Sequence, residues 1–175
     1  MIQARSAASV GFGAALPGTT TGIVPPPPGA TFQLDTGSIG TALPLTSIGA
    51  DAIGPGPTAY KYYDSSGNEF AGYIYLAPVA VTTSTGTVVS TPMLVLGVAS
   101  SACHPKSKCT TPPGFASFDY LGVGFARATG APGDPFTSPA DNALLSMRSS
   151  PSGAMSPGYS LSGSQITIGT LPEGE

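Results

Sequence analysis

The residue best placed for chemistry is Asp35, a carboxylate at the end of the alternating run 31–34 (TFQL). An ionisable group that ends a buried strand is costly unless hydrogen bonds hold it. The next three residues can supply such bonds. Gly37 permits a tight turn that presents backbone N–H groups, and the hydroxyls of Thr36 and Ser38 can donate. The pattern predicts a carboxylate held in a turn, either for acid–base chemistry or as an ordinary structural turn.

A second candidate site lies at Cys103 and Cys109, which enclose His104. Two cysteines and a histidine could hold a metal ion, but short-spaced zinc sites usually carry a second ligand pair, which this sequence lacks. We therefore predict a local disulfide, no metal site and no cofactor, with His104 as a solvated loop residue. No serine stands in a nucleophile-elbow context and no glycine-rich loop suits a phosphate, so Ser-His catalysis and nucleotide binding are not expected.

The composition narrows the class of protein. The chain has 175 residues, enough for one domain, with 24 Gly and 19 Pro. That Gly and Pro content is close to the composition of low-complexity, disordered chains. Disordered chains, however, combine low hydrophobicity with high net charge. This chain is 41% hydrophobic and has a net charge of −3, so we expect it to fold. Six basic residues are too few for a nucleic-acid surface, and no apolar run is long enough for a membrane span.

Short strands separated by glycine-rich turns dominate the sequence. Strands are expected at 9–16, 30–34, 60–63, 69–77, 79–83, 87–98, 118–126, 159–161 and 165–168, with a further apolar stretch at 39–44. Turn compositions at 64–68, 84–86 and 162–164 predict three hairpins, and 101–114 is expected to be a loop. One short helix is predicted at 138–147, with Ser138 as N-cap and Pro139 in the first position. The fold class is therefore mainly β, with antiparallel strands and one short helix.

From residue 35 onward the chain resembles the aspartic peptidases, whose Asp-Thr-Gly-Ser turn follows a mostly apolar strand. The run 118–126 (FDYLGVGFA) is similar to the apolar-apolar-Gly strand that pairs with the catalytic loop in that family, which makes Gly122 a support of the loop. Residues 141–145 resemble the helix that follows, and 159–169 the strands that close the lobe. The hairpin at 60–81 lies where the family has its substrate-covering flap, so Tyr62 or Tyr63 is the expected flap tyrosine. Ordinary cross-strand packing is the alternative for both.

The resemblance implies a single pepsin-like lobe over 30–170, preceded by an N-terminal strand and a Pro-rich segment (1–29) and followed by a tail (171–175). In this family two carboxylates share one proton and activate a water molecule, but the chain holds a single Asp-Thr-Gly. We therefore expect a homodimer in which each chain gives one Asp35. Thr36 would lock the two loops together and Ser38 would orient the carboxylate. The alternatives are one lobe of a larger two-lobed enzyme and an inactive lobe.

The expected function is thus an aspartic endopeptidase acting on peptide or protein substrates, with no nucleic-acid partner and no membrane span. A non-catalytic, β-rich binding module of a secreted or surface protein is the competing hypothesis, and a structural low-complexity domain is the third. Low charge, many Ser and Thr residues and a close cysteine pair favour a secreted, periplasmic or cell-surface location.

Overall fold

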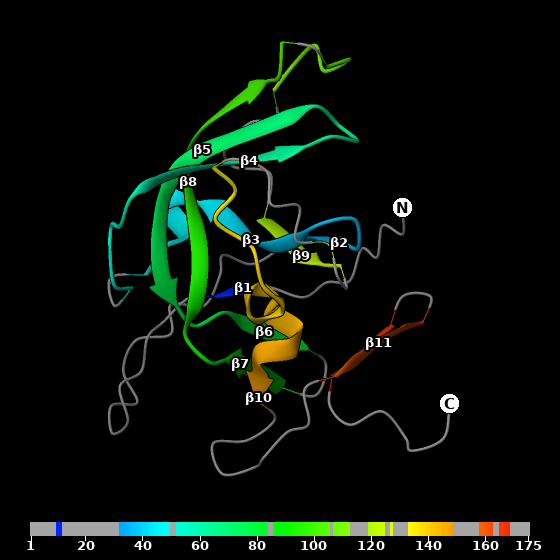
Figure 1. The fold of residues 1–175 in the computed structure, drawn as a ribbon. Helices are drawn as coiled ribbons and strands as arrows, with labels where there is room; N and C mark the ends of the chain where they lie inside the picture. The colour runs from blue at the N-terminus through cyan, green and yellow to red at the C-terminus, as the bar shows by residue number, and fades with distance from the viewer. Residues whose placement is uncertain are drawn as a thin grey trace.

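The structure is a computed structural model that describes residues 10–11, 32–49, 52–83, 86–105, 107–112, 119–124, 127, 133–148, 158–162 and 165–168. The described part of the chain is mainly β, with one short α-helix (Figure 1). Its strands are β1 (Val10–Gly11), β2 (Phe32–Asp35), β3 (Ile39–Pro44), β4 (Thr58–Tyr63), β5 (Asn68–Ala77), β6 (Ala80–Thr83), β7 (Gly86–Ser90), β8 (Met93–Cys103), β9 (Asp119–Val123), β10 (Met147–Arg148), β11 (Tyr159–Ser162) and β12 (Gln165–Ile168). A 3-10 turn, η1 (Leu45–Ser47), follows β3.

Six strands form a mixed sheet in the order β2-β9-β3-β8-β5-β4. β9 runs parallel to β2 and antiparallel to β3, while β3 runs parallel to β8. The expectation of antiparallel strands is therefore wrong for two pairings of this sheet. The reason is that β2 and β3 point in opposite directions on the two sides of β9, so β9 must be parallel to one of them.

The predicted hairpins are all present. β4 pairs with β5 around the turn after Tyr63, β6 pairs with β7, and β11 pairs with β12. Strands β6 and β7 belong to a second sheet in the order β1-β6-β7-β10. The hairpin of β11 and β12 is fastened to the main sheet because the Tyr159 hydroxyl donates a hydrogen bond to the Val123 carbonyl. Turn residues predict local pairing well because they act only on their immediate neighbours.

The single strand expected at 87–98 is wrong, because the chain forms two strands in different sheets. β7 ends at Ser90 and β8 begins at Met93. At the break the Ser90 hydroxyl accepts a hydrogen bond from Val79 N at 2.8 Å, and Thr91 N donates to the Ser146 carbonyl at 3.0 Å. These bonds hold the end of β7 to its own sheet. The next residue is a proline, which has no N–H for a strand ladder.

The loop expected at 101–114 is wrong in its first three residues. β8 continues to Cys103, because Ser101, Ala102 and Cys103 pair with the start of β5. Their small and polar side chains hide the strand from a composition-based prediction.

The predicted helix is divided. Pro139–Asp141 forms a 3-10 turn, η2, and the α-helix α1 spans Ala143–Ser146. Asn142 lies between them in an extended conformation, and its side chain accepts a hydrogen bond from Leu144 N at 3.0 Å. Ser138 is the N-cap of η2, with Pro139 in the first position as predicted, whereas Asn142 is the N-cap of α1. The prediction of one continuous helix over 138–147 is wrong. Side-chain bonds of this kind compete with the helical backbone pattern.

The hydrophobic core has two parts on the two faces of the main sheet. The first lies between the main sheet and α1, which Figure 1 shows beside β7 and β10; it contains Leu34, Leu43, Ala77, Val79, Met93, Val95, Leu121, Val123, Ala143, Leu144 and Met147. The second contains Ile39, Ala42, Tyr63, Phe70, Ile74, Leu96, Val98, Tyr120 and Phe136. β8 and β9 give alternate residues to each, as the two-residue period of a strand requires.

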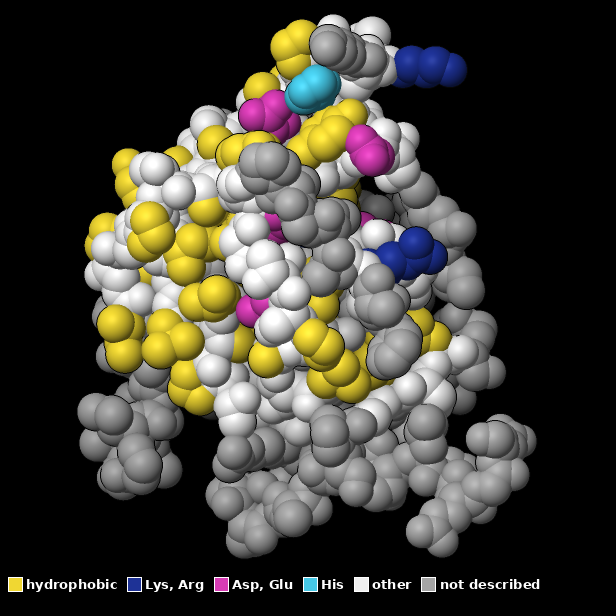
Figure 2. Space-filling model, viewed as in Figure 1, with side chains coloured by type: hydrophobic (Ala, Val, Ile, Leu, Met, Phe, Trp, Pro, Cys, Tyr) yellow, Lys and Arg dark blue, Asp and Glu magenta, His cyan; other side chains and the backbone are white. Residues whose placement is uncertain are grey.

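Two predicted segments fall largely outside the described residues. Of the N-terminal part, only Val10–Gly11 is described, and it pairs with β6. The Pro-rich run at 25–28 and the tail 171–175 are outside. Within the described ranges, no helix has the length and apolar character needed to cross a membrane. Charged side chains are sparse on the face shown in Figure 2, consistent with a charged content of 9%.

Candidate active site

Asp35 is the last residue of β2, and the turn that follows it leads directly into β3. β9 lies between these two strands. Gly122 on β9 is opposite Asp35 in the parallel pairing and opposite Gly40 in the antiparallel pairing. β9, the described part of the strand predicted at 118–126, therefore pairs with the strands on both sides of the Asp35 turn.

Gly122 on β9 and Gly124, directly after its end, allow this close approach. A Cβ atom at Gly122 would lie 2.7 Å from the Ile39 carbonyl carbon and 2.8 Å from Ser38 Oγ. Gly124 N donates to the Ser38 carbonyl at 2.7 Å, and a Cβ there would lie 2.6 Å from the Thr36 carbonyl oxygen. Side chains at either position would push β9 away from the turn. Gly122, predicted from the sequence as a support of the loop, lies in contact with it.

The Asp35 carboxylate is held from within its own turn. Its Oδ1 atom accepts a hydrogen bond from Gly37 N at 2.8 Å, and within the described residues this is its one hydrogen bond. Asp35 and Thr36 are half-buried and Gly37 is exposed. The Thr36 hydroxyl forms no hydrogen bond in the part of the chain that the structure describes. Among the described residues, the second carboxylate oxygen and the Thr36 hydroxyl therefore have no hydrogen-bond partner.

Ser38 is buried and its hydroxyl lies toward β4 rather than on the carboxylate. Among the described residues, Ser38 Oγ and Tyr63 Oη have no full hydrogen-bond partner. The two hydroxyls form a weak interaction that lowers the pKa of Tyr63, although its geometry falls short of a full hydrogen bond. The orienting role predicted for Ser38 has no direct counterpart in a bond to Asp35.

Tyr63, Phe70 and Tyr120 form an aromatic cluster beside the carboxylate. The Tyr63 ring centroid lies 4.9 Å from that of Tyr120 and 5.5 Å from that of Phe70. Burial raises the pKa of Tyr63 far above its ordinary value, and the charge of Asp35 raises it further. Burial and then Asp35 also raise the pKa of Tyr120, which a hydrogen bond with Asn68 partly offsets. Both phenols therefore stay neutral in the field of Asp35.

The two predicted flap tyrosines differ in position. Tyr63 points inward to the aromatic cluster, whereas Tyr62 is half-buried on the other face of β4. The Tyr62 ring packs against His104, with 4.6 Å between the ring centroids. Burial and the neighbouring Asp64 raise the pKa of Tyr62. Adjacent residues of a strand face opposite sides, so only Tyr63 shares a face with the carboxylate.

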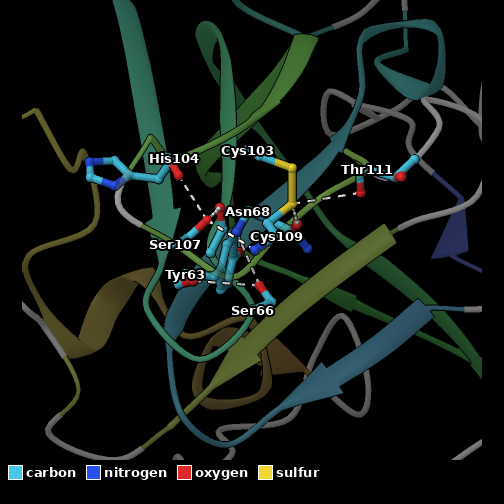
Figure 3. The surroundings of a disulfide bond; sticks show 9 residues. Tyr63, Ser66, Asn68, Cys103, His104, Ser107, Cys109 and Thr111 are labelled. Atoms are coloured by element: carbon cyan, nitrogen blue, oxygen red, sulfur yellow. Dashed lines mark hydrogen bonds between the residues drawn. A yellow bond between two sulfur atoms is a disulfide. The ribbon is translucent and has the colours of Figure 1, made fainter.

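Cys103 and Cys109 form the predicted disulfide, with their Cα atoms 5.3 Å apart (Figure 3). Sulfurs bonded to each other are not thiolate ligands, so the pair is not a metal clip. Among the described residues, no three His, Cys, Asp or Glu side chains are placed to hold a metal ion. His104 lies in the loop after β8, as predicted, but it is half-buried against Tyr62 rather than fully solvated, because the extension of β8 brings it alongside the hairpin.

Sequence reasoning missed an ion pair near the aromatic cluster. Lys61 Nζ lies 2.6 Å from Asp134 Oδ2, and the two side chains are only 1% and 4% exposed. The Lys61 ammonium also lies 5.5 Å from the ring centroid of Phe136. Phe136 covers Gly40, where a Cβ would lie 2.1 Å from the ring. The available signal was that Lys61 stands two residues before Tyr63 and so shares its inward face.

No protein-family model matches the chain, and a search of the curated proteins also finds no match.

Proposed function

We propose that the protein is an aspartic endopeptidase with the fold of a pepsin-like lobe, active as a homodimer with one Asp35 from each chain. The observation that carries the proposal is the position of β9. It is inserted between the strands on both sides of the Asp35 turn, with Gly122 opposite the carboxylate. This is the pairing that the resemblance to the aspartic peptidases implies for the strand that contains Gly122.

The state of the carboxylate also supports the proposal. Asp35 keeps one oxygen without a hydrogen bond to the described residues, and its one bond comes from the turn itself. The buried carboxylate of Asp141, by contrast, accepts three hydrogen bonds. The Thr36 hydroxyl, also without a bond in the described part of the chain, is available to the matching loop of a second chain.

In the proposed reaction the two Asp35 carboxyl groups share one proton, because like charges at such short range cannot both be present. A water molecule binds between them. The ionised carboxylate takes a proton from this water as its oxygen attacks the scissile carbonyl carbon, and the protonated carboxyl group donates to the developing oxyanion. The mechanism needs no cofactor, and it works best at acidic pH, where the shared proton is retained.

The β4–β5 hairpin is the flap in this proposal, and Tyr63 rather than Tyr62 is its catalytically relevant tyrosine. Tyr63 lies on the face of β4 that carries the aromatic cluster next to Asp35. Its neutral phenol would limit the access of water to the reacting groups. The substrate would be an extended peptide or protein segment in the cleft between the two lobes.

The disulfide and the low charge of the chain support a secreted, periplasmic or cell-surface location for this enzyme.

The decisive test compares the wild-type protein with Asp35→Asn in cleavage of an unfolded protein substrate at acidic and neutral pH, with and without a pepstatin-type inhibitor. We expect inhibitor-sensitive cleavage by the wild type and a loss of at least about 1,000-fold in the variant, because a group that moves protons is removed. Circular dichroism should show the same fold for both. Cleavage that persists in Asp35→Asn would overturn the assignment, and the absence of cleavage by the wild type would favour a binding module.

The homodimer is tested by mixing. If each active site needs two chains, an excess of Asp35→Asn should draw the wild-type chain into inactive mixed dimers and lower its activity. Dilution should lower the specific activity in the same way, and the mass in solution should be that of two chains. Activity that is unchanged by mixing and dilution would exclude the homodimer. A monomeric, inactive wild type would point to one lobe of a two-lobed enzyme.

A further inference from the structure

We infer that the disulfide-closed loop Cys103–Cys109 is a clamp on the tip of the β4–β5 hairpin and that it positions Tyr63 beside Asp35. The clamp itself follows from contacts in the structure. Its effect on catalysis rests on the proposed function, in which this hairpin covers the substrate.

The clamp holds the hairpin tip through Gly67. His104 N donates to the Gly67 carbonyl at 2.9 Å. The Ser107 hydroxyl shares its one hydrogen between this carbonyl, at 3.4 Å, and the nearer His104 carbonyl, at 2.8 Å. Gly67 has a φ of +73°, and a Cβ there would lie 2.2 Å from the Ser107 Cβ. The loop therefore lies directly against the tip, and only glycine permits both this backbone conformation and this contact.

One residue connects the clamp to Tyr63. Gly67 N donates to the Tyr63 carbonyl at 2.7 Å, and Ser66 N donates to the same oxygen at 3.2 Å. Gly67 thus binds the loop through its C=O and Tyr63 through its N–H. A shift of Gly67 would be passed to the end of β4, where Tyr63 packs on Tyr120.

The clamp also holds the outer face of the hairpin. His104 packs against Tyr62, the neighbour of Tyr63 on β4. Cys103 pairs with Asn68 at the end of the β5–β8 ladder, and Cys109 Sγ lies 3.3 Å from Asn68 Oδ1. Figure 3 shows Asn68 next to Cys109 of the disulfide. The hairpin tip is therefore held by the backbone at Gly67 and by side chains on both sides of it.

The disulfide closes the clamp. Inside the loop, Ser107 N and Ser107 Oγ both donate to the His104 carbonyl, at 2.9 and 2.8 Å, and Cys109 N donates to Ser107 Oγ at 3.2 Å. These bonds form one short turn. The disulfide then holds Cys109 next to Cys103, the last residue of β8. Without it the loop gains conformational freedom, and its bonds to Gly67 weaken.

The clamp is consequently sensitive to reduction. A dithiol reductant transfers two electrons and two protons to the S–S bond, giving thiols at Cys103 and Cys109, while the dithiol is oxidised to its own disulfide. Tyr63 and Phe70 connect the hairpin tip to the second part of the core, so we expect the effect of reduction to be largest at the tip and not to reach Leu96 in the middle of β8.

The test uses the full chain in three forms: oxidised, reduced with dithiothreitol, and the double variant Cys103→Ala, Cys109→Ala in the absence of reductant. Hydrogen exchange is measured by mass spectrometry at the amides of Ser66, Gly67 and His104. The Leu96 amide in the core is the internal reference. We expect the amides at the tip to exchange about tenfold faster, or more, in the reduced and variant forms than in the oxidised form, while exchange at Leu96 stays the same. Equal exchange at the tip in all three forms, or faster exchange at Leu96 as well, would overturn the clamp.

The catalytic consequence is measured on the same three samples. Since the clamp positions the flap and not the carboxylate, we expect KM to rise about threefold or more with a smaller change in kcat. A loose tip with unchanged KM and kcat would overturn the positioning role. Should the wild type show no Asp35-dependent cleavage, the proposed function and this catalytic role both fail, while the exchange data still decide the clamp.

A second variant tests the clamp in case the double cysteine variant does not fold. Ser107→Ala keeps the disulfide but removes the hydroxyl that joins the loop to the Gly67 carbonyl. It should raise tip exchange by a smaller factor than reduction does. Loss of the hydroxyl without any change at Gly67 would also count against the clamp.

Discussion

The Asp35 turn and the segment 133–141 both carry carboxylates into the protein, but they differ in how these charges are satisfied. Asp141 is buried, and its Oδ2 atom accepts hydrogen bonds from Thr137 N at 2.9 Å, Ser138 N at 2.9 Å and Ser138 Oγ at 3.3 Å. Asp35 is half-buried and accepts one bond, from Gly37 N, within the described residues. The buried carboxylate thus accepts three hydrogen bonds, all at one oxygen, and the more accessible carboxylate accepts one.

Asp134, in the same segment as Asp141, also has more than one partner. It pairs with Lys61 at 2.6 Å and accepts a bond from Phe136 N at 3.0 Å. By contrast, the described buried side chains without a hydrogen-bond partner are the hydroxyls of Ser38, Thr41 and Tyr63.

These hydroxyls belong to the turn after Asp35, to β3 and to β4. Buried polar groups are usually paired, so these three unpaired hydroxyls agree with the chemical role that we propose for the Asp35 turn. The comparison supports a structural role for segment 133–141 and a chemical role for the Asp35 turn.

The largest stability effect is expected at Lys61. Lys61→Met removes the cation that neutralises Asp134 inside the second core, and breaking a buried pair from one side typically costs about 3–5 kcal/mol of unfolding free energy. Urea unfolding followed by circular dichroism measures this cost. The double variant Lys61→Met, Asp134→Leu is the control and should recover most of the loss, because no uncompensated charge remains. A single variant within about 1 kcal/mol of wild type would show that segment 133–141 does not depend on the pair.

The next largest effect on stability comes from a direct comparison of the carboxylates Asp141 and Asp35. Asp141→Ala leaves the donors of Thr137 and Ser138 without their acceptor, and the loss of such a capping side chain costs about 1–2 kcal/mol. Asp35→Ala removes one bond within an accessible turn, and we expect about 0.5 kcal/mol or less. Both values come from the same urea titration. If Asp35→Ala proved the more destabilising of the two, Asp35 would be a structural carboxylate and the contrast would fail.

Much of this fold could be predicted from local patterns. The three hairpins depend on turn residues that act over a few positions, and the Asp35 turn was visible from Gly37 and the hydroxyls beside it. The pairing of 118–126 with that turn came from the family resemblance. The extension of β8 through Cys103 was hidden because its last residues are small and polar, so their strand conformation depends on β5.

The remainder could not be predicted because it depends on contacts between distant parts of the chain. Lys61 and Asp134 are 73 residues apart, and neither position shows its partner in the sequence. Tyr63 and Tyr120 meet only because β9 is inserted between β2 and β3. Once β4 is known, strand alternation places Tyr62 and Tyr63 on opposite faces of the sheet. Which of the two faces lies toward Asp35 is set by the tertiary fold.

Tyr63→Phe is expected to have the smallest effect on the free energy of unfolding at neutral pH. Its effect should also depend more on pH than that of the other variants. The hydroxyl has no full hydrogen-bond partner among the described residues, so its removal should change stability by about 1 kcal/mol or less near pH 7. The pKa of Tyr63 is raised in the folded state by burial and then by Asp35. The stabilisation linked to this shift is complete below the unfolded pKa of about 10 and is lost as the pH rises above it toward the folded value.

Wild-type stability should therefore fall by up to about 1.4 kcal/mol more per pH unit above about pH 10 than that of Tyr63→Phe. Urea titrations between about pH 7 and about pH 11 measure the two slopes, and Tyr73→Phe, which removes an exposed phenol, is the matched control. Tyr120 is present in both proteins, so its own contribution to the pH dependence of stability cancels in the comparison. Parallel slopes for wild type and Tyr63→Phe would mean that Tyr63 ionises freely, in contact with water. Tyr63 would then not lie in the desolvated surroundings of Asp35 on which its flap role depends.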